Sequence, residues 1–258
     1  MRRILFATLI LAALFCASSQ AAPILTGTFN IAGNLTVTNP GTGGCAASTR
    51  CIFWTDPPAT TANKADIAGS GLSGVFATIA GFSGNDQATI ATLQDPPEVV
   101  NGAGFPPQVF MTFCATTACA PAVTTTALIN YIFAGVEPST QCGDPAAVGQ
   151  HCTVPGSLFN FVNNPGGAGP SGAQATATWV VKGVTNDGQS SWTGNFTAQF
   201  SIPYQDVFAQ LASAGFVTNS YSATFTFVNA VPEAGTMSML GIGLVLFSTV
   251  LRRKARKI

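Results

Sequence analysis

Several stretches of this chain alternate between apolar and polar residues with a period of two, which constrains the fold more than any other feature. Between residues 28 and 38, for example, Phe29, Ile31, Leu35 and Val37 share one side. A strand with one apolar and one polar face is typical of an antiparallel sheet with one buried face. The pattern therefore predicts an all-β fold, specifically an antiparallel β-sandwich. The same alternation recurs at residues 175–181, 191–201 and 220–228, and weaker strand candidates are residues 75–82, 88–93, 109–114, 128–133 and 158–162.

Two local signals add detail to this body. Asn186-Asp187-Gly188 separates two strand candidates, and because Asn and Gly tolerate positive φ this triplet predicts a hairpin turn. Apolar residues after Pro203 recur at helical spacing, and Gly215 follows the last of them. Pro at the first helical position and Gly just past the end predict one short amphipathic helix covering one end of the β core.

The N-terminus has the order of features found in secretory signal peptides. Arg2 and Arg3 precede an apolar run from residue 4 to 17, and Ser19-Gln20-Ala21 provides small residues for a signal peptidase. Residues 1–21 are therefore predicted to be a cleaved signal peptide, and the mature protein is expected to be exported.

The C-terminus predicts a transmembrane helix. Residues 234–251 contain no charge, and at about 1.5 Å per residue they would span about 27 Å, close to the roughly 30 Å hydrocarbon core of a bilayer. A basic tail, residues 252–258, follows and is expected to stay on the cytoplasmic side of the inner membrane. Its cations are Arg252, Arg253, Lys254, Arg256 and Lys257.

Immediately before this helix stand Val231, Pro232, Glu233 and Ala234. A Pro-Glu motif, one hydrophobic helix and a terminal Arg/Lys cluster together resemble the PEP-CTERM sorting signal, across residues 231–258. The resemblance implies processing by an exosortase-type enzyme in the inner membrane, and a final place at the cell surface or in an exopolysaccharide matrix. The chain then divides into a signal peptide (1–21), a β body (22–230) and a sorting anchor (231–258).

The body is anionic although the whole chain sums to zero. It contains three basic residues, Arg50, Lys64 and Lys182, against nine acidic ones, which gives a formal net charge of −6. Nucleic acid is not expected as a partner, because binding it requires a basic surface.

Six cysteines remain after the signal peptide, which suits an oxidising compartment. Six cysteines allow 15 pairings. The prediction is the local set, Cys45–Cys51, Cys114–Cys119 and Cys142–Cys152. Zinc is the alternative, but the chain has one His and no C-x-x-C, so no metal or other cofactor is expected.

No catalytic constellation emerges from the sequence, and the protein is not expected to be an enzyme. The run Gly69–Gly74 matches G-x-G-x-x-G but lacks the strand-loop-helix context of a dinucleotide site. His151, the only His, lies in a predicted disulfide loop, and the acidic residues are scattered.

The favoured hypothesis is an exported structural protein of the cell surface or exopolysaccharide matrix, and the alternative is a carbohydrate-binding module. A secreted hydrolase and an ice-binding protein are less favoured. The candidate glycan contact is Trp54, which follows the Cys45–Cys51 loop and could stack on a sugar ring. The opposing hypothesis is that Trp54 packs beneath its own loop.

Overall fold

The computed structural model describes residues 24–42, 45, 50–55, 63–79, 84–90, 93–94, 101–114 and 121–230. Within these ranges the protein is built from β-strands and one α-helix, which confirms the all-β prediction. The predicted signal peptide and sorting anchor lie outside the described residues. No helix in the described ranges is both long enough and apolar enough to cross a membrane.

The strands and helices follow one another along the chain as follows. They are β1 (Gly27–Thr38), β2 (Cys51–Thr55), β3 (Lys64–Ile67), the 3-10 helix η1 (Gly74–Ala77), β4 (Gly84–Ile90), β5 (Leu93–Gln94), β6 (Gly104–Cys114), β7 (Pro121–Ile132), β8 (His151–Cys152), β9 (Asn160–Pro165), β10 (Ala173–Thr185), β11 (Ser190–Gln199), α2 (Tyr204–Ala214) and β12 (Phe216–Asn229).

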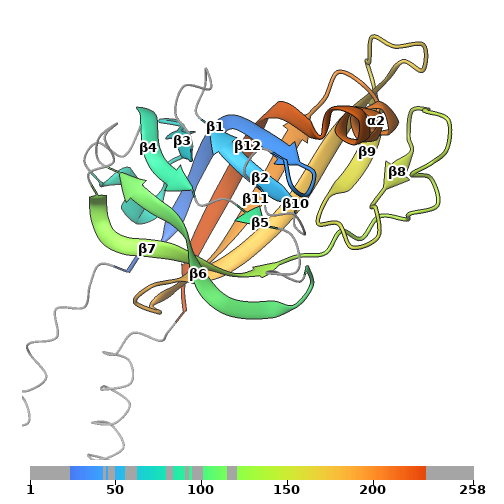
Figure 1. Ribbon diagram of the computed structural model, residues 1–258. Helices are drawn as coiled ribbons and strands as arrows, with labels where there is room; N and C mark the ends of the chain where they lie inside the picture. The colour runs from blue at the N-terminus through green and yellow to red at the C-terminus, as the bar shows by residue number, and fades with distance from the viewer. Residues whose placement is uncertain are drawn as a thin grey trace, which may run out of the picture.

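Eight of these strands form a closed antiparallel barrel, so the predicted sandwich is wrong. The order around the ring is β11-β12-β1-β3-β4-β6-β7-β10, and β10 pairs with β11 to close it. Figure 1 shows the long strands β1, β10, β11 and β12 side by side, with β6 and β7 (green) crossing in front of them. Inward-facing and outward-facing residues alternate along a barrel strand as they do in a sandwich, and the sequence pattern is therefore the same.

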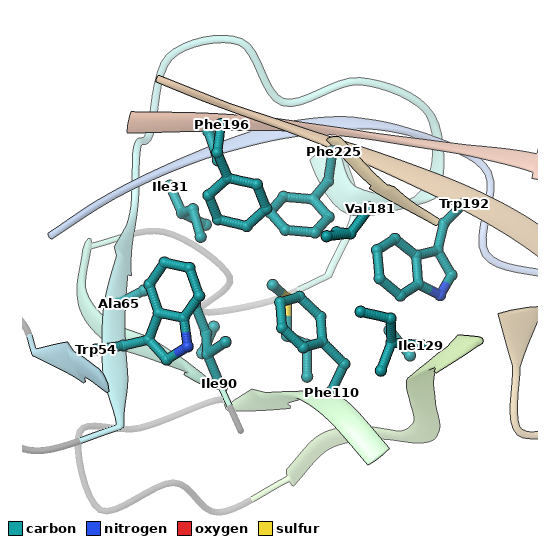
Figure 2. Packing of buried hydrophobic residues seen from close by; sticks show 14 of the residues in the cluster. Ile31, Trp54, Ala65, Ile90, Phe110, Ile129, Val181, Trp192, Phe196 and Phe225 are labelled. Carbon is teal, nitrogen blue, oxygen red and sulfur yellow. The ribbon is translucent and has the colours of Figure 1, made fainter. Parts of the chain in front are cut away.

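The largest inward-facing residues are aromatic and pack into one core. On β1 and β12, which pair over 12 residues, Phe29 lies opposite Phe225, and their rings stack at 5.1 Å. Figure 2 shows Phe196 and Phe225 pointing across the interior toward Phe110. Each large ring removed from water contributes roughly 1.5–3 kcal/mol, and the aromatic core is therefore the main stabilising feature of the barrel.

All four strongly alternating stretches are strands, namely β1, β10, β11 and β12. The predicted hairpin joins β10 to β11, and Gly188 in its turn has φ 70°. Strand candidates 88–93, 109–114, 128–133 and 158–162 overlap β4, β6, β7 and β9. The candidate at 75–82 is wrong, because η1 occupies its start and buries Phe76 completely against Phe29 and Phe113.

The predicted amphipathic helix is confirmed as α2. It starts one residue later than predicted, because Pro203 is extended and precedes the first helical residue. Gly215 ends the helix in the left-handed conformation, with φ 81°. Beside it, the Asn39 side chain donates a hydrogen bond of 2.8 Å to the Leu211 carbonyl, which satisfies one carbonyl of the last turn. In Figure 1, α2 lies at one end of the barrel next to β9.

Two of the three predicted disulfides, Cys45–Cys51 and Cys142–Cys152, are present. Cys114 is also disulfide-bonded. Its predicted partner, Cys119, lies outside the described residues, so that pairing stays a prediction.

Candidate functional site

The barrel wall divides at one end because two long strands change partners along their length. On one edge β1 pairs with β3 at Ile31 and Ala32, and then with β2 from Asn34 onward. Likewise β10 pairs with β9 up to Thr178 and with β7 from Val181 onward. The outer edge of β2 pairs with β5 and that of β9 pairs with β8, and among the described strands β5 and β8 do not pair, so the ladder is interrupted here.

A cavity of about 450 Å³ lies at this interruption, and we call it the barrel cavity. Leu35, Val37 and Ile52 line it from β1 and β2. Across the cavity stand Phe161 of β9 and the preceding loop residues Leu158 and Phe159. Nearly every lining side chain is apolar, so the cavity offers a hydrocarbon-like environment.

The cavity exists because small residues replace large ones on the inner face of β10 and β11. Ala177 lies directly opposite Ala198, whereas the next inward-facing pair is Trp179 with Phe196, whose rings stack at 4.9 Å. The alanines leave space, and Trp179, stacked on Phe196, lines the cavity beyond them. The sequence does contain a signal for this cavity that the sequence analysis missed. Along β10 the inward-facing positions are Ala from residue 173 to 177 and then become Trp179 and Val181.

Helix α2 closes one side, contributing Val207, Phe208 and Leu211 to the lining. Its start is fixed by Asn163, a fully buried residue of β9 whose Oδ1 accepts a 3.0 Å hydrogen bond from the Tyr204 backbone N–H. The Tyr204 hydroxyl donates to the Gln141 carbonyl at 2.9 Å, and the neighbouring Cys142 is bonded to Cys152. The helix is therefore tied to β8 and β9, and this wall of the cavity is preformed.

Four lining residues carry polar groups that bear on what the cavity can bind. The Asn39 side chain is committed to Leu211, and the Ser157 hydroxyl accepts a hydrogen bond from the Phe159 backbone N–H at 3.1 Å. The indole Nε1–H of the buried Trp179 has no partner among the described residues. Arg50 is the one charged residue in the lining, and its side chain is exposed at the rim.

Among the described residues, Arg50 is the one charged group in the cavity lining, and the other titratable groups with notable surroundings lie outside it. Burial raises the pKa of Tyr221 above its ordinary value, and nearby Asp66 raises it further. Burial also raises the pKa of Tyr204. His151 Nδ1 lies 3.2 Å from the Glu137 carboxylate, outside the cavity lining. Within the described ranges, no three His, Cys, Asp or Glu residues are grouped closely enough to hold a metal ion.

Trp54 does not offer its face to a glycan, because it is completely buried. Its side chain enters the barrel from β2 and contacts Tyr221 at 4.9 Å and Phe196 at 5.2 Å between ring centroids. The packing hypothesis is therefore the one observed, although the indole packs in the barrel core rather than beneath its loop. The sorting motif Val231–Ala234 and the basic tail lie outside the described residues.

A second surface is the outer face of β11, β12 and β1, whose middle part is polar but uncharged; the exposed apolar residues Phe216 and Val228 lie at the two ends of β12. Its hydroxyls and amides bond across the strands, as between Thr36 and Thr218 at 2.8 Å and between Thr224 and Asn30 at 2.8 Å. The polar outward-facing residues include Thr28, Asn30, Asn34 and Thr36 on β1, Thr218, Ser220, Ser222, Thr224 and Thr226 on β12, and Thr193, Asn195 and Thr197 on β11.

Comparisons of this chain with protein-family models, with curated proteins and with solved structures found no match. The function must therefore be argued from the barrel itself.

Proposed function

We propose that this protein is a non-enzymatic binding protein of the cell surface or extracellular matrix, which holds a small apolar ligand in the barrel cavity. The observation that carries the proposal is the cavity of about 450 Å³ with an apolar lining on a closed barrel. Ligand sites in proteins have volumes of roughly 300–1,000 Å³ and are mostly apolar, and the open ends of β-barrels are a common location for them.

The contrast between the two ends of the barrel supports binding rather than a packing defect. Around Phe29, Phe76 and Phe227 the interior is filled by rings in direct contact. At the other end, Ala177 and Ala198 leave the space empty between rigid walls. An unfilled apolar cavity costs stability, by roughly 24 cal/mol per Å³ in mutational series, and a bound apolar ligand would recover part of this loss.

Export and sorting are the second part of the proposal. The charged N-terminus with its apolar run, the even number of cysteines outside it and the Pro232-Glu233 motif before an apolar segment all support this route. The disulfides Cys45–Cys51 and Cys142–Cys152 suit the oxidising compartment that the route implies. An exosortase-type enzyme would then process the anchor.

The binding proposal is tested with an uncharged photoreactive probe, dodecanol bearing a diazirine, added to the full chain in nanodiscs of zwitterionic lipid. Chymotryptic peptides carrying the probe are then mapped by mass spectrometry. Labelling is expected around residues 154–161 and 205–217, separately from any label that the apolar segment 234–251 takes up from the bilayer.

Two variants fill the cavity from different walls, Ala198→Phe from β11 and Leu211→Trp from α2. Both should reduce the cavity label at least tenfold and leave the label in 234–251 unchanged. Gln210→Trp, on the exposed side of α2, is the matched control and should label as the unaltered chain does. Equal cavity labelling in all four chains would refute the proposal.

A second candidate function, polysaccharide binding, is favoured by the uncharged outer face of β11, β12 and β1. Regular rows of hydroxyl and amide groups can donate hydrogen bonds to a glycan and accept them from it. In the free protein, water makes these hydrogen bonds instead. Thr197→Glu with Ser222→Glu adds charge to the middle of this face. Loss of retention on the host's polysaccharide in this double variant, with the cavity label intact, would support it.

A further inference from the structure

We infer that the ligand of the barrel cavity is a linear amphiphile with a single carboxylate, its hydrocarbon tail inside the cavity and its head bound by Arg50. This inference rests on the proposed function, since it names the ligand class of the same cavity. It follows from the charges, the free hydrogen-bond donors and the distribution of apolar surface around the cavity.

Arg50 is placed to receive an anion. It is the one charged residue in the lining, and among the described residues the ion pair that occurs is His151 with Glu137, which leaves the guanidinium without an acidic partner. The body's other two cations are engaged elsewhere: Lys182 lies 4.4 Å from the Tyr131 ring centroid, and Lys64 also has its own interactions. One unpaired cation matches one negative charge, which favours a monoanion.

The other polar groups of the cavity point the same way. The Asn39 side-chain NH2 and the Ser157 oxygen already make hydrogen bonds within the protein. The Trp179 Nε1–H, which has no partner among the described residues, and the Arg50 guanidinium are both donors. These two groups favour a ligand that brings acceptors. A carboxylate is planar and accepts two parallel bonds from a guanidinium, which is the strongest pairing available to an Arg.

The remaining lining determines the rest of the ligand. Apart from Arg50, the walls are formed by apolar residues that include Leu35, Val37 and Ile52 of β1 and β2, and Phe159 and Phe161. A sugar in this space would leave its hydroxyls without partners, at a cost of about 1–3 kcal/mol for each buried hydroxyl. An alkyl chain has no such groups. A cavity with one charged residue at its rim and an apolar interior therefore fits an amphiphilic ligand.

The backbone beside Arg50 is held firmly. Cys51 is the first residue of β2, pairs with Thr38 of β1, and is bonded to Cys45. Because both the ladder and the disulfide fix the neighbouring residue, binding an anion costs mainly the rotamer freedom of the Arg50 side chain.

The inference is tested by competition against the photoreactive dodecanol, again with the full chain in zwitterionic nanodiscs. The competitors share one tail and differ in the head: dodecanoate, dodecanol and dodecyltrimethylammonium. Dodecanoate should compete about three- to tenfold better than dodecanol, a range that allows for solvent screening at the exposed rim. In the series from octanoate to hexadecanoate, affinity should rise by up to roughly fourfold per methylene until the cavity is full.

Arg50→Gln should bring dodecanoate to within about twofold of dodecanol. Lys182→Gln, which removes one positive charge away from the cavity, is the matched control and should keep the preference. A wild-type protein that binds dodecanol as well as dodecanoate, or an Arg50→Gln variant that keeps the preference, would overturn the carboxylate inference and leave the proposed function standing. A failure of every competitor to reduce the cavity label would instead count against the proposed function, and this inference would fall with it.

Discussion

The most informative stability test compares the same substitution at two tryptophans on adjacent strands, Trp192 of β11 and Trp179 of β10. Both are buried inside the barrel, at 2% and 1% exposure. The Trp192 Nε1–H donates hydrogen bonds to the carbonyls of Leu128 at 3.1 Å and Val184 at 3.2 Å. These carbonyls belong to β7 and β10, which pair with each other in the ring. The Trp179 Nε1–H has no partner among the described residues.

Trp192→Phe and Trp179→Phe remove the same ring atoms, so each should lose roughly 1–2 kcal/mol from reduced apolar burial. Trp192→Phe additionally leaves two carbonyls without their donor, which should cost about a further 1–2 kcal/mol. The expected difference between the variants is therefore about 1–2 kcal/mol, or roughly 2–8 °C in melting temperature for a domain of this size.

The assay is guanidinium and thermal unfolding of the chain without residues 231–258, followed by far-UV circular dichroism because the substitutions alter the fluorescence. Equal midpoints for the two variants would show that the indole N–H of Trp192 does not hold the β7–β10 seam. A greater loss in Trp179→Phe would contradict the reasoning outright.

Burial raises the pKa of Tyr221, so the folded state keeps this phenol protonated where the unfolded chain ionises it. The contribution of this group to the free energy of unfolding should be constant below pH about 10 and fall above it, and Tyr221→Phe should reduce the loss of stability above pH about 10 in pH-dependent unfolding. Non-reducing peptide mapping should find Cys114 bonded to Cys119, and a crosslink from Cys114 to any other cysteine would contradict local pairing. Replacing Pro232 and Glu233 together by Ala should leave membrane insertion unchanged but block anchor cleavage, so that uncut precursor accumulates in the inner membrane. Intact mass of the mature chain in the native host measures this, and a wild-type protein that keeps residues 234–258 there would argue against sorting.

Local features of the fold could be predicted because neighbouring residues determine them. Alternation of apolar and polar residues identified β1, β10, β11 and β12. The Asn-Asp-Gly triplet identified the hairpin between β10 and β11, and Pro203 and Gly215 marked the two ends of α2. Closure into a barrel could not, because it depends on pairings between strands that are distant in the sequence, β1 with β12 and β7 with β10. The alternation of inward-facing and outward-facing residues along a strand is the same in a barrel and in a sandwich.

The candidate site was harder to predict for a related reason. Its walls come from segments that are distant in the sequence, and no single segment has an unusual composition. Arg50 could be counted as one of three cations in the body, but only the β1–β2 ladder places it beside Val37 and Ile52. Trp54 shows the reverse case, since a loop rich in Pro and Cys suggested exposure while the strand pairing buried the ring.

The full-length pairing of β1 with β12 has a consequence for how the molecule is presented. Gly27 lies opposite Phe227, so the chain enters and leaves the barrel side by side at the filled end, while Thr38 and Phe216 meet at the end that holds the cavity. A tether attached beyond Asn229 would therefore hold the barrel by its filled end and turn the cavity mouth outward. Ligands would reach it from the surroundings rather than from the supporting bilayer, and releasing the tether would leave the mouth as accessible as before.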